Sequence, residues 1–145
     1  MRRRIKAAMD EHQAGIVALI HRTDVALNLG RLAGQEALAQ VRRETVRRMR
    51  AYQQFKHVKI FDPMVEFGTP EQQQSAARMR ERCLAAGEAF MDHMQRWPMH
   101  EVVKGWDAYR RSVNAMTAAM RLHLAREQRE VPLLFELGEP VRRSA

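Results

Sequence analysis

Two side chains near the end of the sequence could act together on one ligand. His123 and Glu127 stand four residues apart in the stretch RLHLAREQREVPLLF, residues 121–135. On a helix this spacing places both side chains on one face, one turn apart. The face is otherwise apolar, and a buried polar group costs free energy unless a partner satisfies it. Imidazole nitrogen and carboxylate oxygen are suitable ligands for iron, manganese or zinc.

Two further histidines could complete such a site from other parts of the chain. Of the six histidines, only His12, His57 and His123 fall on the apolar stripe of a predicted helix. At ~1.5 Å rise per residue, His57 and His123 lie at one height, about 25 residues from a predicted turn, and His12 lies within about two turns of it. We therefore expect His12, His57, His123 and Glu127 to converge on one metal ion. The alternative is that each histidine has its own partner in the core.

The other three histidines are expected on the surface. His21 is nine residues from His12, which is about 180° around a helix. His93 and His100 flank a predicted break and are expected at the surface of one end of the molecule.

These candidate ligands need helices to position them, and three breaks divide the chain into four segments. The breaks are 30–34, 67–70 and 97–98, and Thr69-Pro70-Glu71 is typical of a helix start. Between the breaks, apolar residues recur with a 3.6-residue period. The sequence thus predicts an all-α fold, an up-down-up-down antiparallel four-helix bundle over residues 1–137, followed by a short basic tail at 138–145.

Composition limits the possible environments and partners. The 145 residues are enough for one domain, and the single Cys83 excludes an internal disulfide or a cysteine-based zinc site. No apolar run of ~18 residues predicts a membrane span. Asp10 and Glu11 interrupt the segment after the basic start, which argues against a signal peptide. We expect a cytoplasmic protein.

The formal net charge of +8 raises the question of an anionic partner. Arginines cluster in the second and third segments: Arg42, Arg43, Arg47, Arg48, Arg50, Arg78, Arg80 and Arg82. Acidic residues are interspersed and no aromatic residues alternate with the arginines for base stacking. We therefore expect a solvated surface rather than a nucleic-acid site. Trp97 and Trp106 could form a homodimer contact near one end, and burial in the core explains them equally well.

The sequence resembles the hemerythrin-like family of HHE cation-binding domains. The stretch from His123 to Phe135, with Pro132 inside it, looks like the family's last-helix motif. The stretch 53–63 looks like a degenerate copy of the same motif, and Glu11-His12 looks like the first-helix ligand.

Several departures from the family pattern limit what the resemblance implies. Gln53 stands where the family has a histidine, His57 stands where it has a bridging glutamate, and the third segment begins with glutamines at 72–74 in place of histidines. Met79 and Cys83 are candidate sulfur ligands in that segment. The resemblance then implies one iron, or zinc, held by His12, His57, His123 and Glu127, with oxygen, peroxide or nitric oxide as its ligand. A metal-free helical interaction module and a mononuclear iron enzyme are the alternatives.

Overall fold

The computed structural model describes residues 2–138, and this part of the chain is all-α with no strand. The elements, in chain order, are α1 (Arg2–Asn28), α2 (Gly30–Lys56), a π-helix (His57–Phe61), α3 (Asp62–Phe67), α4 (Pro70–Arg96), α5 (Met99–Lys104) and α6 (Trp106–Glu136). The all-α prediction is confirmed. Two short helices and the π-helix were not predicted. The tail predicted at 138–145 lies, apart from Gly138, outside the described residues.

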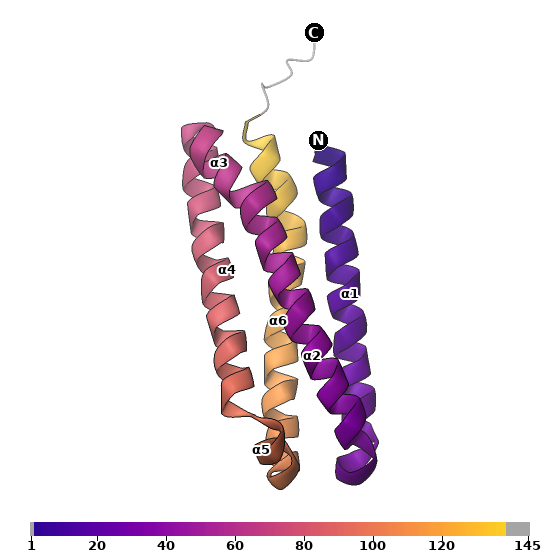
Figure 1. Ribbon diagram of the computed structural model, residues 1–145. Coiled ribbons are helices and arrows are strands. Elements are labelled where there is room, and N and C mark those ends of the chain that lie inside the picture. Colours follow the sequence, from indigo (N-terminus) through magenta and orange to yellow (C-terminus); the bar gives the residue numbers. More distant parts are fainter. Residues whose placement is uncertain (1, 139–145) are drawn as a thin grey trace.

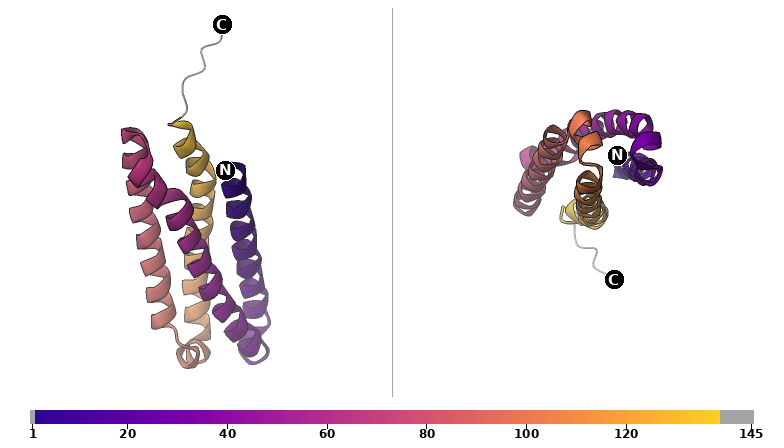
Figure 2. Two further views of the ribbon diagram at one scale, coloured as in Figure 1. Left: turned by 45° about the horizontal axis from the view of Figure 1, so that its top comes forward. Right: turned by 90° about the horizontal axis from the view of Figure 1, so that it is seen from below.

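The four long helices lie side by side, and each runs opposite to the long helix before it (Figure 1). Helix α6 lies between α1 and α4. Helix α2 crosses obliquely in front of it, from beside α1 at one end to beside α4 at the other (Figure 2). As a result α1, α2, α4 and α6 can all contribute side chains to a common core. None of the helices described is long and apolar enough to cross a membrane.

The first turn is shorter than the sequence suggested. Gly30 has a φ of 86°, a left-handed conformation that suits glycine, and α2 begins there directly. Gly34 was predicted to belong to the break but lies inside α2. A Cβ atom on Gly34 would lie 2.2 Å from the carbonyl oxygen of Ala26, so glycine is needed for close packing of the two helices.

The second turn follows the predicted helix-start signal. The backbone N–H of Gln72 donates to the Thr69 hydroxyl, and the backbone N–H of Thr69 donates to the side-chain oxygen of Gln72. This is a capping box, with Pro70 at the first helical position. The third turn carries the short helix α5 between Pro98 and Gly105.

The end of α2 loosens into one π-helical turn before α3. The backbone N–H of Asp62 bonds to the carbonyl of His57, five residues earlier, whereas an α-helix bonds four residues back. Ile60 and Phe61 in this turn are buried, and so is Lys56 just before it. The π-helix therefore lies at the end of the core that contains the predicted metal ligands.

Buried residues form two clusters along the helices. One surrounds Trp106 and Tyr109 near α5. The other lies toward the ends where α1 begins and α6 finishes, and includes Met9, Tyr52 and Leu124. The polar residues that could carry function lie within this second cluster.

Candidate functional site

The centre of the candidate site is a buried ion pair between α2 and α6. The ammonium nitrogen of Lys56 lies 2.7 Å from Oε2 of Glu127, and the two side chains are only 4% and 5% exposed. The ammonium also lies 4.2 Å from the centre of the Tyr52 ring, within range of a cation–π interaction. Lys56 is the last residue of α2, one helical turn after Tyr52, so both side chains project from the same face.

Tyr52 and Gln13 complete the hydrogen bonding around this pair. The Tyr52 hydroxyl donates to Oε1 of Glu127 at 2.9 Å, so each carboxylate oxygen accepts a hydrogen bond. The Gln13 amide nitrogen of α1 donates to the Tyr52 hydroxyl at 2.9 Å and to the Leu124 carbonyl at 3.1 Å. Three helices are thereby joined through buried polar groups.

The network continues outward to the surface between α1 and α6. Gln128 donates to Oε1 of Gln13 and to Oδ1 of Asp10, each at 2.9 Å. The Lys6 ammonium donates to both Gln128 and Asp10 at 2.7 Å. A continuous chain of polar contacts thus leads from solvent to the buried carboxylate of Glu127.

His123 lies on the other side of the carboxylate, beside Cys83 of α4. Its Nε2 is 3.4 Å from Oε2 of Glu127, which is ion-pair distance, but Nε2 has no hydrogen-bond partner. The close contact with the Cys83 side chain, followed by that with Glu127, raises the pKa of His123 to about 9 against the opposing effects of burial and Lys56. The imidazole is therefore protonated at neutral pH.

The surroundings also set the protonation states of Glu127 and Tyr52. Burial alone would raise the pKa of Glu127, but contact with His123 and the charge of Lys56 outweigh it and lower the pKa. Burial, and next the charge of Glu127, raise the pKa of Tyr52 above its usual value. The centre thus contains a carboxylate, a neutral hydroxyl donor and two cations.

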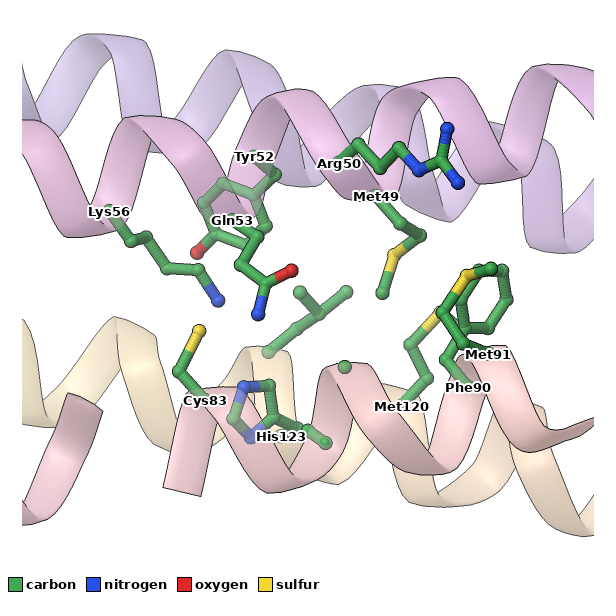
Figure 3. A pocket seen from close by; sticks show the side chains of 13 residues that line it. Met49, Arg50, Tyr52, Gln53, Lys56, Cys83, Phe90, Met91, Met120 and His123 are labelled. Carbon is green, nitrogen blue, oxygen red and sulfur yellow. The ribbon is translucent and has the colours of Figure 1, made fainter. Parts of the chain in front are cut away.

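A pocket of about 120 Å³ lies next to this centre, between α2, α4 and α6 (Figure 3). Its apolar wall consists of Met49, Phe90, Met91, Met120 and Leu124. Lys56, Gln53, Tyr52, Cys83 and His123 gather toward one end, as Figure 3 shows. A Cβ on Gly87 would lie 2.7 Å from the Gln53 amide nitrogen, so glycine leaves room for that amide. The pocket therefore has an apolar body and a polar end.

The structure places the other two predicted ligands away from Glu127. His12 is half-buried and stacks on Tyr52 and Phe55, with ring centres 5.5 and 5.0 Å apart. His57 is also half-buried, and its ring meets the edge of Phe61 at 5.4 Å. Burial is the main cause that lowers the pKa of each imidazole.

The charge of Lys56 lowers the pKa of both histidines, but the other charged residues around them differ. Arg48 and Glu11 act on the pKa of His12, whereas Asp62 and Arg80 act on that of His57. The predicted ligands thus diverge around Lys56. Of the four, only His123 and Glu127 lie together.

As they stand, these residues do not fit a metal ion. Within residues 2–138, no group of three or more His, Cys, Asp or Glu side chains is arranged to hold one. The Lys56 ammonium donates to the carboxylate that was expected to be the main anionic ligand. The metal site implied by the family resemblance remains a prediction.

Three residues of the site were not predicted from the sequence. Gln13, Tyr52 and Lys56 each stand one position from a residue that was placed on the stripe, namely His12, Gln53 and His57. The signal was present as a second stripe, since Tyr52, Lys56 and Ile60 recur every four residues and all are buried. A lysine at the centre of such a stripe indicates a buried charge that needs a partner.

Two predictions of surface exposure were wrong. His93 is 4% exposed, and its ring stacks on Tyr109 at 5.9 Å. Arg42, which was assigned to the solvated arginine cluster, is also buried. Both side chains face the Tyr109 ring of α6. His21 and His100 are exposed, as predicted.

No protein-family profile, curated protein or solved structure matches this chain.

Proposed function

We propose that the chain is a hemerythrin-like antiparallel four-helix bundle that binds a small organic ligand beside the Lys56–Glu127 pair. The observation that carries the proposal is the 2.7 Å contact between the two buried charges, which lies next to an apolar pocket. Lys56 provides the positive charge that a metal would otherwise supply to Glu127. A divalent cation at the same carboxylate would be repelled by the ammonium in a medium of low dielectric constant.

The pocket selects the apolar part of the ligand. Methionine and phenylalanine side chains form most of its apolar wall, and methionine adapts readily to the shape of a bound group. Cavities on the order of 150 Å³ lined by apolar residues bind benzene. At about 120 Å³, this pocket suits a ring or branched chain of similar size.

The polar end selects the head group. Lys56 and protonated His123 carry two positive charges, and Glu127 carries one negative charge, so the centre has a surplus positive charge. The Gln53 amide is a further donor at the same end of the pocket. A small carboxylate with an apolar body would place its charge beside these donors and its body against the methionines.

Binding of benzoate tests this function, with benzamide as the neutral analogue. We expect benzoate to give a saturable rise in melting temperature and chemical-shift changes at Gln53, Cys83 and His123, and benzamide to bind more weakly. Ala86 lines the pocket and is half-buried, so Ala86→Leu should fill the space and abolish binding. The exposed Ala85 on the same helix provides the control, because Ala85→Leu should bind normally.

The proposal fails if benzoate does not bind saturably, or if Ala86→Leu binds it as well as Ala85→Leu does. Equal affinity for benzoate and benzamide would show that the negative charge of the ligand does not contribute to binding. Such a result would leave a purely apolar pocket and contradict the carboxylate assignment.

A second candidate function is binding of iron or zinc, with oxygen, peroxide or nitric oxide as its ligand. One observation favours it: Nε2 of His57 and Nε2 of His123 are both buried and have no hydrogen-bond partner. A neutral ring nitrogen can bind a metal, but His123 is protonated and would first have to release its proton. For a metal to bind at Glu127, the Lys56 side chain would have to move away from Glu127, and the His57 ring would have to turn toward Glu127. Metal analysis of the purified protein, with Glu127→Gln as the variant, tests this candidate.

A further inference from the structure

A second buried cation lies in the other cluster, far along the helices from the Lys56–Glu127 pair. Arg42 of α2 is 9% exposed. Its Nη2 donates to the backbone carbonyl of Trp97, and its guanidinium lies 5.3 Å from the centre of the Tyr109 ring. Its Nη1 is buried and has no hydrogen-bond partner.

No carboxylate in residues 2–138 forms an ion pair with Arg42. Glu44, the nearest acidic residue along the chain, pairs with Arg22 at 2.5 Å. The groups that surround Arg42 come from four helices and are neutral or apolar: Ile20 and Thr23 from α1, Thr45 from α2 itself, His93 from α4, and Tyr109 from α6. Arg42 thus differs from Lys56, which has Glu127 opposite it.

His93 does not supply the missing negative charge and does not add a positive one. Burial, and next the charges of Arg42 and Arg96, lower the pKa of His93 to about 4. The imidazole is neutral at physiological pH. The guanidinium keeps its proton under all physiological conditions, so Arg42 carries the buried positive charge, and the exposed Arg96 adds positive charge nearby.

An uncompensated buried charge is costly, and proteins pair such charges or provide them with a counter-ion. A cavity of about 40 Å³ adjoins Arg42. A single water needs roughly 10–15 Å³ by this measure, so the cavity has room for one small ion. The hydroxyls of Thr23 and Thr45 donate to the backbone carbonyls of Leu19 and Val41, at 2.8 and 2.7 Å. These two hydroxyls are therefore already engaged, whereas Nη1 of Arg42 is a buried donor without a hydrogen-bond partner.

We propose that the cavity beside Arg42 binds a small inorganic anion of the halide class, held by Nη1. A water molecule would satisfy the hydrogen bond of Nη1 but leave the positive charge unbalanced. A halide accepts the hydrogen bond from Nη1 and also balances the positive charge of Arg42. At about 40 Å³ the cavity suits a monatomic anion better than phosphate, sulfate or a nucleotide.

The first experiment measures thermal unfolding in sodium chloride and in sodium gluconate at equal ionic strength. Gluconate is too large for the cavity, so chloride alone should raise the melting temperature, and the rise should saturate. Arg42→Met should abolish the difference between the two salts. Arg43→Met is the matched control, since Arg43 is the exposed neighbour on the same helix, and it should retain the difference.

A second measurement does not depend on any variant folding. A bromide ion, identified by anomalous scattering in crystals of the unmodified protein grown in sodium bromide, should lie at hydrogen-bond distance from Nη1 of Arg42. Water at that position overturns the proposal. Equal stability in chloride and gluconate also overturns it, as does a chloride effect that survives in Arg42→Met.

Discussion

Lys56 and Glu127 form an ion pair in which each charge has little access to water. Their side chains are 4% and 5% exposed, and the ammonium and carboxylate are 2.7 Å apart. Surface ion pairs contribute little to stability, but removing one partner of a buried pair leaves the other without compensation. The pair therefore makes the core sensitive to single substitutions at either position.

Lys56→Met should destabilise the protein by about 3–5 kcal/mol, because the buried Glu127 carboxylate would lose the shorter of its two ion-pair contacts and keep only the one with His123 at 3.4 Å. Denaturant unfolding measures the change. The double variant Lys56→Met/Glu127→Gln should recover most of the loss, since the amide oxygen can still accept from Tyr52. Lys59→Met, an exposed control three residues beyond the end of α2, should stay within about 0.5 kcal/mol of the unmodified protein. A similar effect of Lys56→Met and Lys59→Met would show that the pair does not form in solution.

Glu127→Gln distinguishes the ion pair from a metal centre when metal content and stability are measured together. If Lys56 is the partner of Glu127, the substitution leaves the ammonium unpaired and costs about 3–5 kcal/mol, with no change in metal content. We expect this outcome. If Glu127 ligates a metal, the purified protein contains metal, the variant loses it, and the melting temperature of the metal-free form changes little.

His93→Gln should cost about 1–3 kcal/mol, because the ring is buried against Tyr109 and Nδ1 lies 3.4 Å from the Ser112 hydroxyl. The exposed histidines provide the comparison, and His21→Gln and His100→Gln should each change stability by less than about 0.5 kcal/mol. Thermal or denaturant unfolding of the three variants under the same conditions measures these changes in stability. A loss for His93→Gln no larger than for His21→Gln would place His93 at the surface.

His93 should also make stability depend on pH in a defined range. Its pKa is about 4 in the folded protein and ~6.5 in the unfolded chain, so the unfolded chain binds the proton first as the pH falls. The stabilising contribution is complete above pH ~6.5 and is lost as the pH falls toward 4. Denaturant unfolding at a series of pH values should show a larger loss of stability between pH ~6.5 and 4 in the unmodified protein than in His93→Gln. Parallel pH profiles for the two proteins would contradict the assignment.

The sequence was sufficient to predict the four long helices because the determining signals are local. Apolar residues with a 3.6-residue period predict the long helices, and the capping residues Thr69 and Gln72 fix the start of α4. Glu127 was predicted to be buried and is. The short helix α5 and the π-helix carry no comparable local signal.

The details of the site were harder to predict because they depend on helix phase. One residue corresponds to ~100° around a helix, so the difference between His57 and Lys56 changes which face of α2 meets the core. A broad apolar stripe is compatible with burial of either residue, and only the packing of α2 against α1, α4 and α6 determines which one is buried. The burial of Arg42 also depends on packing, because composition alone places arginine at the surface.

The π-helical turn at His57–Phe61 has a consequence for the comparison of this chain with related ones. A π-turn takes up one more residue than an α-helical turn does, so a helix can accept an inserted residue there without shifting the segments on either side. A relative whose second helix is α-helical throughout would match this chain only with a one-residue gap within this turn. Without that gap, its counterparts of Lys56 and of α3 could not both be assigned correctly.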